Sequence, residues 1–248
     1  MGQAMMAGLP AESGIEVIGG LRRNSPGGAE LLAAADVLVD FTIAESTLPL
    51  MLAALEAGVR PVSGTSGVSD DALRQVDEAA RAKDLPAVWA NQFSLGGALM
   101  MHFCRLAARY MDSATVLEAH HETKADAPSG TAWELARQIR AAHGDDLEYW
   151  PSKHETVEGV RGGNVGGVRV HAMRMPGLLG WNEVTFAGGG ETLAVRQTDG
   201  SRDSFVGPVA RTVREVMRTE RVGLIRGYGT VIGLDRAVAA PAAAAVES

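Results

Sequence analysis

The segment EAHHETKADAPSGTA, from Glu118 to Ala132, places groups that transfer protons next to groups that bind anions. Its titratable side chains include two adjacent histidines, His120 and His121, and the lysine Lys124. A histidine gains or loses a proton near neutral pH, and a lysine beside an anion site can pair with a carboxylate or donate a proton. These residue types at this spacing predict a site for proton transfer to a charged substrate.

The end of the same segment predicts an anion-binding helix start. Ser129, Gly130 and Thr131 begin an expected helix that runs to Ala142, and the first backbone N–H groups of a helix have no partner within it. Gly130 lets a ligand approach the backbone, and the two hydroxyls add donors. The simpler interpretation is that Asp126 or Ser129 only caps the helix, which is the commoner use of such residues. The residues alone leave both interpretations open.

A metal site is the weaker interpretation of the two histidines. Neighbouring side chains of a regular strand point to opposite faces, so His120 and His121 do not easily ligate one ion. Glu118 and Glu122 add no recognised metal-ligand spacing. We therefore expect no metal, and a small dicarboxylate substrate fits the lysine, the histidines and the anion-binding turn better.

The elements that precede this segment alternate between strands and helices. Apolar runs predict strands at Ile15–Leu21, Ala35–Thr42, the start of RPVSGTSG and Pro86–Ala90. Periodic runs predict helices at Met5–Leu9, Ser46–Ala57 and Asp70–Lys83, the last with Ser69 as its N-cap. Strands that alternate with helices predict an α/β fold with a parallel, doubly wound sheet.

The pattern changes in the second part of the chain. A long helix is expected over Gly96–Asp112, with one apolar face made by Leu99, Phe103, Leu106 and Tyr110. The strand ATVLEAHH and the helix after Ser129 follow, the helix with Leu135, Ala136 and Ile139 inward. Three strand-like runs then come without helices between them: VRVHAMRM, NEVTFAG and ETLAVRQT. The last two are separated by a glycine turn and predict an antiparallel hairpin.

These changes predict two domains and a tail. We expect a dinucleotide-binding domain at residues 1–92 and 206–236, which includes a final helix over Phe205–Arg218 with Pro208 in its first turn. An α+β domain with an open mixed sheet, for substrate binding and oligomerisation, is expected at 93–205. The low-complexity residues 237–248 are expected to be disordered.

The composition narrows the class of protein. A net charge of −7 among 248 residues argues against a nucleic-acid-binding surface. Cys104 is the only cysteine, so no internal disulfide is possible and a reducing, cytoplasmic location is the expectation. No signal peptide opens the sequence, and no apolar run approaches the ~20 residues that span a bilayer.

The signature segment resembles one enzyme family. It matches every fixed position of E-x-H-H-x-x-K-x-D-x-P-S-G-T-A, the pattern of the 4-hydroxy-tetrahydrodipicolinate reductases, also called dihydrodipicolinate reductases. Further matches occur in the same order on both sides of it: VDFT, GTSG, NQFSLG, VHAMRMPGLLGWNEVTF and ETLAVRQTDGSRDSF. The resemblance extends from Met1 to about Leu234. The signature speaks against other two-domain nicotinamide oxidoreductases, such as amino-acid or sugar dehydrogenases.

The resemblance implies a two-domain enzyme that reduces a cyclic dicarboxylate imine with NADPH or NADH, in lysine and diaminopimelate biosynthesis. One domain is Rossmann-like, and the sheets of the other typically assemble a homotetramer. By the family pattern His120 is the proton donor and acceptor, and Lys124 is the general acid that works with it. The residues implied to contact a substrate carboxylate are His121, Ser129, Gly130 and Thr131.

The resemblance also implies where the cofactor binds. The GTSG turn follows a strand, where nucleotide-binding loops belong, although a lone Gly-x-x-Gly is usually only a turn. ANQF lies at the crossing into the second domain, and the family commonly has asparagine in place of Gln92. The residues implied to contact cofactor in these two segments are Gly64, Thr65, Ser66, Ala90, Asn91, Gln92 and Phe93.

Arg22 and Arg23 predict a preference for NADPH. They follow the expected strand at Ile15–Leu21, where an NAD-binding site would carry an acidic residue that binds the ribose. Two guanidinium groups suit a 2′-phosphate instead. The alternative is that one or both arginines only face solvent.

The start of the sequence departs from the family pattern. The family opens with a strand and a G-x-x-G-R-M-G loop, and here only Met1 and Gly2 match the end of that loop. Because the missing strand is central and its loop binds the pyrophosphate, we expect a weakened cofactor site and a true start further upstream. A non-catalytic dicarboxylate-binding or assembly protein is therefore the alternative function.

Overall fold

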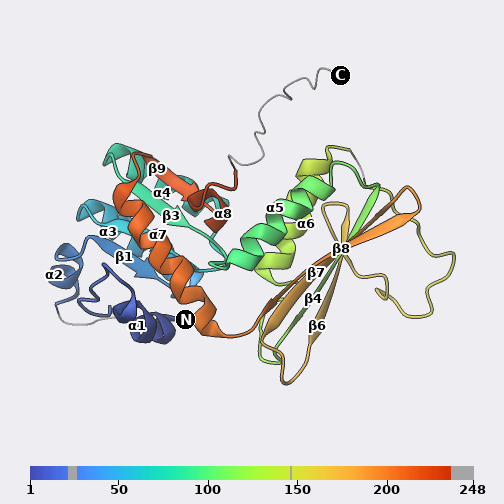
Figure 1. Ribbon diagram of the computed structural model, residues 1–248, viewed down its shortest axis with the longest axis horizontal. Helices are drawn as coiled ribbons and strands as arrows, with labels where there is room; N and C mark the ends of the chain where they lie inside the picture. Colours follow the sequence, from blue (N-terminus) through green and yellow to red (C-terminus); the bar gives the residue numbers. More distant parts are fainter. Residues whose placement is uncertain (22–26, 146, 236–248) are drawn as a thin grey trace, which may run out of the picture. The chain divides into compact units, whose positions relative to one another are not determined.

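The computed structural model describes residues 1–21, 27–145 and 147–235 and divides the chain into two compact units. The first unit comprises Met1–Leu95 and the segment that begins at Phe205, and the second comprises Gly96–Ser204. In Figure 1 the first unit carries the blue and red ends of the colour scale, and the second runs from green through yellow to orange. The tail expected at 237–248 lies outside the described residues.

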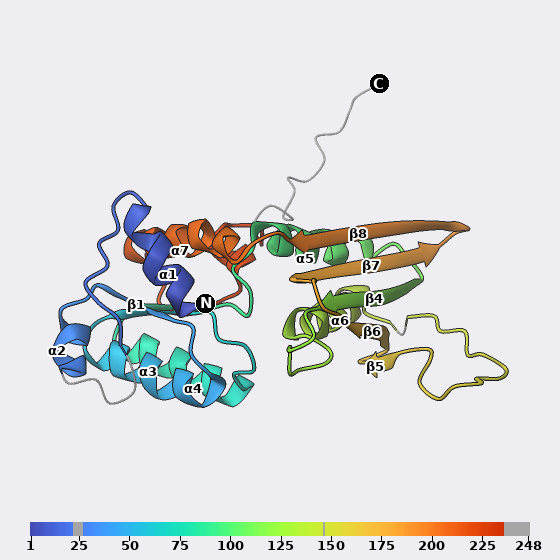
Figure 2. The ribbon, with the colours of Figure 1, turned by 90° about the horizontal axis from the view of Figure 1, so that it is seen from below.

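The first unit is built on a parallel sheet with the strand order β1-β2-β3-β9, in which every neighbouring pair is parallel. Its strands are β1 (Val37–Asp40), β2 (Arg60–Ser63), β3 (Pro86–Trp89) and β9 (Gly223–Arg226). Helices α3 and α4 lie on one face of this sheet, and α7, with α1 beside it, lies on the other (Figure 2). The prediction of a doubly wound α/β fold is therefore confirmed.

The predicted helices of the first unit correspond to α1 (Gly2–Gly8), α3 (Ala44–Glu56), α4 (Asp70–Ala82) and α7 (Val206–Arg218). This unit also contains α2 (Gly28–Ala33), α8 (Tyr228–Val231) and the 3₁₀ turn η1 (Leu9–Ala11), which were not predicted, and a second 3₁₀ turn, η2 (Arg202–Phe205), lies at the boundary of the two units. Ser69 caps α4 as predicted, because its hydroxyl accepts a hydrogen bond from the Ala72 amide at 3.1 Å. No helix in the described ranges has both the length and the apolar character needed to cross a bilayer.

The predicted buried strand at Ile15–Leu21 is wrong. This segment has no strand assignment, and Ile18 is 45% exposed. A strand forms only where its backbone groups pair with a neighbouring strand, and within the described ranges this segment joins neither sheet. Its apolar residues alone are therefore insufficient to make it a strand.

The second unit is built on a mixed sheet with the order β5-β6-β4-β7-β8. Its strands are β4 (Ser113–His120), β5 (Gly163–Val165), β6 (Val168–Arg174), β7 (Gly180–Gly188) and β8 (Glu191–Asp199), and its helices are α5 (Leu95–Ala107) and α6 (Gly130–His143). Strands β4 and β6 are parallel, and the other neighbours are antiparallel. The β7–β8 hairpin turns at Gly189 and Gly190, both with positive φ, as the glycine turn predicts.

One face of this second sheet packs against α6 to form the core of the unit. Val116, Val184 and Phe186 from the strands and Leu135 and Ile139 from α6 are almost fully buried in one cluster. Leu135, Ala136 and Ile139 thus face inward as predicted.

The apolar face predicted for the long helix is the exposed one. Phe103, Leu106 and Tyr110 are 50%, 43% and 76% exposed. The buried positions of α5 are instead Gly97, Met100 and Cys104, and the helix ends at Ala107 rather than Asp112. The apolar residues of this helix are compatible with burial of either of these two stripes. The stripe that is buried in this unit is the one with less bulky side chains.

We predict that Leu135→Ala lowers the free energy of unfolding by about 2–5 kcal/mol, because it leaves a cavity in the core. Urea unfolding followed by circular dichroism measures the change. Arg137→Ala, at an exposed position of the same helix, serves as the control and should cost no more than about 1 kcal/mol. Equal losses in the two variants would show that this core does not stabilise the unit as described.

Candidate active site

Strand β4 determines which side chains of the signature segment come together. Glu118 and His120 are two residues apart, so both point to the face that α6 covers. His121 follows the end of the strand, and its Nδ1 lies 2.8 Å from the Thr123 hydroxyl at an exposed position. The two histidines therefore have separate partners.

The buried carboxylate of Glu118 lies at the centre of the site. Its side chain is fully buried, and Arg174 from the neighbouring strand β6 forms a two-pronged ion pair with it. Arg174 Nη2 donates to Oε1 at 2.9 Å, and Nη1 donates to Oε2 at 2.9 Å. Such a planar, charge-assisted pair fixes both partners in direction as well as distance.

Two further groups donate to the same carboxylate. The Ser129 amide donates to Oε1 at 3.1 Å, and the His120 Nδ1 atom lies 2.5 Å from Oε2. Burial by itself would raise the pKa of Glu118, but the hydrogen bonds from His120, Arg174 and the Ser129 amide outweigh burial and hold this pKa below its ordinary value. Glu118 is therefore an ionised acceptor at neutral pH.

The His120 ring also lies against the neighbouring strand. His120 pairs in register with Gly180 on β7, and a Cβ atom at Gly180 would stand 2.9 Å from His120 Cδ2 and 3.1 Å from Nε2. A side chain at Gly180 would thus displace the ring. The missing side chain leaves the Nε2 edge of His120 close to the β7 backbone.

The turn between β4 and α6 carries the other predicted residues. Ser129 caps α6, because its hydroxyl accepts from the Ala132 amide at 3.2 Å, and Gly130 and Thr131 form the first turn of the helix. The capping interpretation of Ser129 is thus correct. It does not exclude the anion site, because the positive end of the α6 dipole lies at the same turn.

Lys124 lies in the same turn and forms an ion pair with Asp126. Its Nζ donates to Asp126 Oδ1 at 2.6 Å, and Arg174 Nη2 donates to the Asp126 carbonyl at 2.5 Å. Burial by itself would raise the pKa of Asp126, but the hydrogen bond and charge of Lys124, together with backbone hydrogen bonds, outweigh burial and hold this pKa below its ordinary value. Arg174 therefore contacts both Glu118 and the turn that carries Lys124.

The predicted cofactor residues of the first unit gather where β1, β2 and β3 end. Gly64, Thr65 and Ser66 follow β2, the segment Ala90–Phe93 follows β3, and these two strands are neighbours. The Ala90 amide donates to the Ser63 carbonyl at 3.0 Å. Ligands of doubly wound sheets bind at the carboxyl ends of the strands, so the position suits a dinucleotide.

A second buried carboxylate, Asp40 at the end of β1, holds this edge together. It accepts hydrogen bonds from the hydroxyls of Thr42 at 2.6 Å, Ser63 at 2.7 Å, Thr47 at 2.9 Å and Thr65 at 3.1 Å. The Thr42 amide donates to it as well, at 2.9 Å. Asp40 thereby connects β1, the start of α3 and the GTSG turn.

The GTSG turn also requires glycine at its first position. A Cβ atom at Gly64 would stand 2.1 Å from Phe41 Cε1, which no relaxed structure allows. The Trp89 indole donates to the Thr65 carbonyl at 2.9 Å, and Phe93 is buried against Phe41. Packing thus determines the backbone path of this turn.

The remaining predicted cofactor residues are not brought into this edge by any described contact. Gly2 begins α1, and a Cβ atom there would meet no described atom within 4 Å. Arg22 and Arg23 lie outside the described residues, so the structure does not test them.

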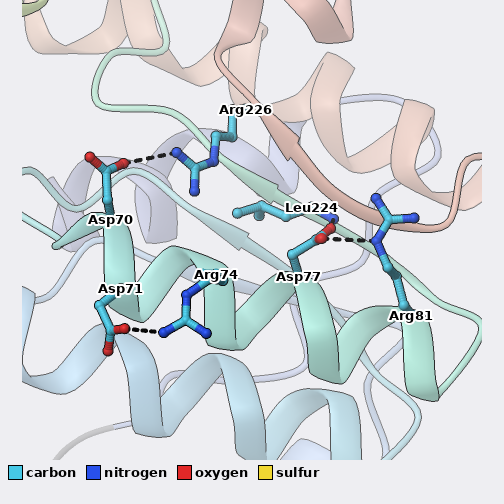
Figure 3. A pocket seen from close by; sticks show the side chains of 7 residues that line it. All are labelled: Asp70, Asp71, Arg74, Asp77, Arg81, Leu224 and Arg226. Atoms are coloured by element: carbon cyan, nitrogen blue, oxygen red, sulfur yellow. Dashed lines mark hydrogen bonds and ion pairs between the residues drawn. The ribbon is translucent and has the colours of Figure 1, made fainter.

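A surface pocket of the first unit lies between α4 and β9 and contains none of the predicted residues (Figure 3). Its arginines each form an ion pair with an aspartate of α4: Arg226 with Asp70 at 2.9 Å, Arg81 with Asp77 at 2.8 Å, and Arg74 with Asp71. Because these charges compensate one another, the pocket presents no net cation to an anionic cofactor.

Three residues that organise the two sites are not predicted from the sequence. The sequence suggests only a possible metal-ligand role for Glu118, and it suggests no role for Arg174 or Asp40. The spacing of Glu118 from His120 could have indicated a shared strand face. Arg174 carries no such signal, because it lies 56 residues from Glu118 in sequence.

The fold and the two sites define a class, the two-domain oxidoreductases that use a nicotinamide cofactor. Comparison with known families makes this specific. Residues 1–93 match the family model described as dihydrodipicolinate reductase, N-terminus, and residues 96–227 match dihydrodipicolinate reductase, C-terminus. The chain belongs to the dihydrodipicolinate reductase family, and the resemblance of its signature segment is confirmed.

Individual relatives agree with this assignment. The chain is 39% identical over 197 residues to the 4-hydroxy-tetrahydrodipicolinate reductase of Lysinibacillus sphaericus (strain C3-41), covering 79% of this chain and 74% of the relative. It is 38% identical over 198 residues to the enzyme of the same name from Bacillus thuringiensis (strain Al Hakam), covering 80% and 74%. Both relatives are matched over most of their length.

A solved structure is also similar. Dipicolinate-bound dihydrodipicolinate reductase from Paenisporosarcina sp. TG-14 has a TM-score of 0.68 and 34% identity, and the match covers 79% of this chain and 73% of that one. An engineered D-amino acid dehydrogenase bound to NADP⁺ has a TM-score of 0.50 and 15% identity over 97% of this chain and 96% of that one, which shows likeness of fold only.

We predict that Glu118 makes the stability of the protein depend on pH. Its pKa is lower in the folded chain than the ordinary value of 4.5, so its contribution is present above that value and is lost as pH falls through the folded pKa. The difference in unfolding free energy between the wild type and Glu118→Gln should therefore shrink as pH falls. Urea titrations between about pH 7 and pH 3 measure this difference; a constant difference would contradict the lowered pKa.

Proposed function

We propose that the chain catalyses the NAD(P)H-dependent reduction of 4-hydroxy-tetrahydrodipicolinate to tetrahydrodipicolinate, a step of lysine and diaminopimelate biosynthesis. Relatives with 38–39% identity carry the name of this activity. The observation that carries the proposal is the arrangement around Glu118, in which a proton-transfer histidine, a lysine and an anion-binding helix start lie within one hydrogen-bonded turn. A small cyclic dicarboxylate needs these three groups.

The chemistry of the reaction matches these groups. The substrate loses its hydroxyl group as water, and a nicotinamide cofactor, when bound, would supply a hydride to the resulting C=C–C=N system. The negative charge that develops on the ring must be protonated, so the overall reaction takes up one proton besides the hydride. We propose that His120 exchanges this proton and that Lys124, in the neighbouring turn, is the general acid that works with it.

The substrate carboxylates require donors that do not themselves react. We propose that one carboxylate binds beside the start of α6, in contact with Ser129, Gly130 and Thr131, whose two hydroxyls can donate hydrogen bonds. His121, which is half-buried beside this turn, is the proposed further contact. The positive end of the α6 dipole supports this assignment.

The nicotinamide cofactor is proposed to bind at the carboxyl ends of β2 and β3. The residues assigned to it are Gly2, Gly64, Thr65, Ser66, Ala90, Asn91, Gln92 and Phe93, with Arg22 and Arg23 at the adenosine ribose. The rigid GTSG turn supports the assignment, because packing against Phe41 and hydrogen bonding to Asp40 place its backbone before any ligand arrives.

The open face of the sheet in the second unit supports a proposed homotetramer. Side chains on this face include Met173, which is 44% exposed, and Arg196, which stacks over the Trp181 ring at 4.1 Å. Another copy of the chain would cover this face, as the family resemblance implies.

A reducing, cytoplasmic location is also proposed, because Cys104 is a free thiol. The burial of this thiol raises its pKa to about 12.

The experiment that tests the function supplies freshly condensed pyruvate and aspartate semialdehyde and follows oxidation of NADPH. Turnover supports the proposal. If the dicarboxylate binds but no turnover occurs, the alternative of a non-catalytic dicarboxylate-binding protein is favoured.

We predict that Lys124→Ala lowers kcat by roughly a hundredfold and leaves NADPH affinity unchanged, because the variant lacks the general acid. Lys153→Ala, an exposed lysine of the same unit, is the control and should keep wild-type kcat. Steady-state kinetics and NADPH fluorescence titration measure the two quantities. Loss of NADPH binding in Lys124→Ala would show that the role assigned to this lysine is wrong.

We also predict a lower KM for NADPH than for NADH. Arg22→Ala should raise the KM for NADPH about tenfold and leave that for NADH unchanged, since only NADPH carries the 2′-phosphate that a guanidinium group binds. Initial rates with both cofactors decide the matter. A lower KM for NADH in the wild type would refute the preference.

A further inference from the structure

We infer that Glu118 and Arg174 are positioning residues that set the tautomer of His120 and hold it in register with the substrate-binding turn. The inference rests on the proposed role of His120 in proton transfer. Neither residue is assigned a catalytic contact; both act through the groups they hold.

Each hydrogen bond to the Glu118 carboxylate has a defined donor and acceptor. Oε1 accepts from the Ser129 amide and from Arg174 Nη2, and Oε2 accepts from Arg174 Nη1. An ionised carboxylate only accepts hydrogen bonds, so the contact at 2.5 Å between Oε2 and His120 requires that Nδ1 carries the proton. Neutral His120 therefore has its lone pair on Nε2.

The Nε2 atom of His120 lies away from Glu118. This atom lies at the edge of the ring that faces Gly180, where a Cβ atom would stand 3.1 Å away. Because Nδ1 is occupied by Glu118, Nε2 is the ring atom that can take up or release a proton during the reaction.

The Glu118–Arg174 ion pair also contacts the rest of the site. Arg174 donates to Glu118 with both Nη atoms and also to the Asp126 carbonyl, and Asp126 holds Lys124. The Ser129 amide, at the start of α6, donates to the same carboxylate. One ion pair thus holds the histidine, the lysine turn and the helix start relative to one another.

Glu118→Gln separates this role from simple packing, because an amide has one acceptor atom and one donor group. Its oxygen is expected at the Oε1 position, where two fixed donors, the Ser129 amide and Arg174 Nη2, need an acceptor. The NH₂ group then takes the Oε2 position, where Arg174 Nη1 is the one fixed donor and must move away, and His120 adapts by moving its proton to Nε2. The substitution therefore inverts the tautomer while preserving the shape of the side chain.

The experiment measures the tautomer and the kinetics of the same proteins. In full-length, ¹⁵N-histidine-labelled chain, His120 is expected to be protonated at Nδ1 in the wild type and at Nε2 in Glu118→Gln. With the substrate mixture described above, kcat of Glu118→Gln is expected to fall roughly a hundredfold, while NADPH affinity stays within about twofold of wild type. A loss of general packing would not invert the tautomer.

Two further variants complete the test. Arg174→Lys keeps the Glu118 carboxylate ionised and so should keep the Nδ1 tautomer, but it loses the second prong and the Asp126 contact; kcat should fall about tenfold and the substrate KM should rise. Glu134→Gln makes the same substitution on α6, where the carboxylate accepts from Gln138, and should change neither measurement.

Three results would overturn the inference: a wild-type His120 protonated at Nε2, an unchanged tautomer in Glu118→Gln, or wild-type kcat in that variant. If Glu118→Gln does not fold, the spectra of the wild type and of Arg174→Lys still test the inference. A His120 protonated at Nε2 in either of these proteins would contradict it. Absence of wild-type turnover would instead reject the proposed function, and the spectra would still report whether Glu118 sets the tautomer.

Discussion

The second unit depends on one buried negative charge, the carboxylate of Glu118. A charge removed from water is costly unless it is paired and fully hydrogen-bonded, and here four donors meet two oxygens. The four donors come from three parts of the unit: His120 on strand β4, Arg174 on strand β6 with two donors, and Ser129 at the start of helix α6. Satisfying one carboxylate therefore fixes the register of the two strands and the entry of the helix together.

The first unit solves a related problem with different partners. Asp40 is also a buried carboxylate at the end of a strand, but the donors that surround it are hydroxyls and a backbone amide. Because these hydroxyls belong to several segments, their hydrogen bonds to Asp40 hold the segments together, which suits a turn whose backbone faces a ligand. At Glu118 one planar group, the Arg174 guanidinium, supplies two of the hydrogen bonds, which suits the fixed orientation of a single histidine.

The parts of the fold that sequence predicts best are those in which local chemistry decides. Ser69 and Ser129 cap their helices as expected, and the glycine turn closes the β7–β8 hairpin. The predictions that fail concern segments whose structure depends on contacts with residues far away in the sequence. Ile15–Leu21 has the composition of a strand but joins no described ladder, and α5 buries Met100 and Cys104 rather than the bulkier stripe that contains Phe103. Arg174 belongs to the same group, because only pairing of β4 with β6 places it beside Glu118.

The signature segment is best understood as a closed loop of hydrogen bonds rather than a set of reactive groups. Glu118 and His120 share a strand face because they are two residues apart, and the same alternation directs His121 elsewhere. Lys124 and Asp126 repeat this spacing and pair with each other. The loop closes where the Ser129 amide returns to Glu118 across eleven residues of sequence. A change at any of these positions would therefore open the loop, which gives a physical reason why residues without a chemical role occur in the pattern together with those that have one.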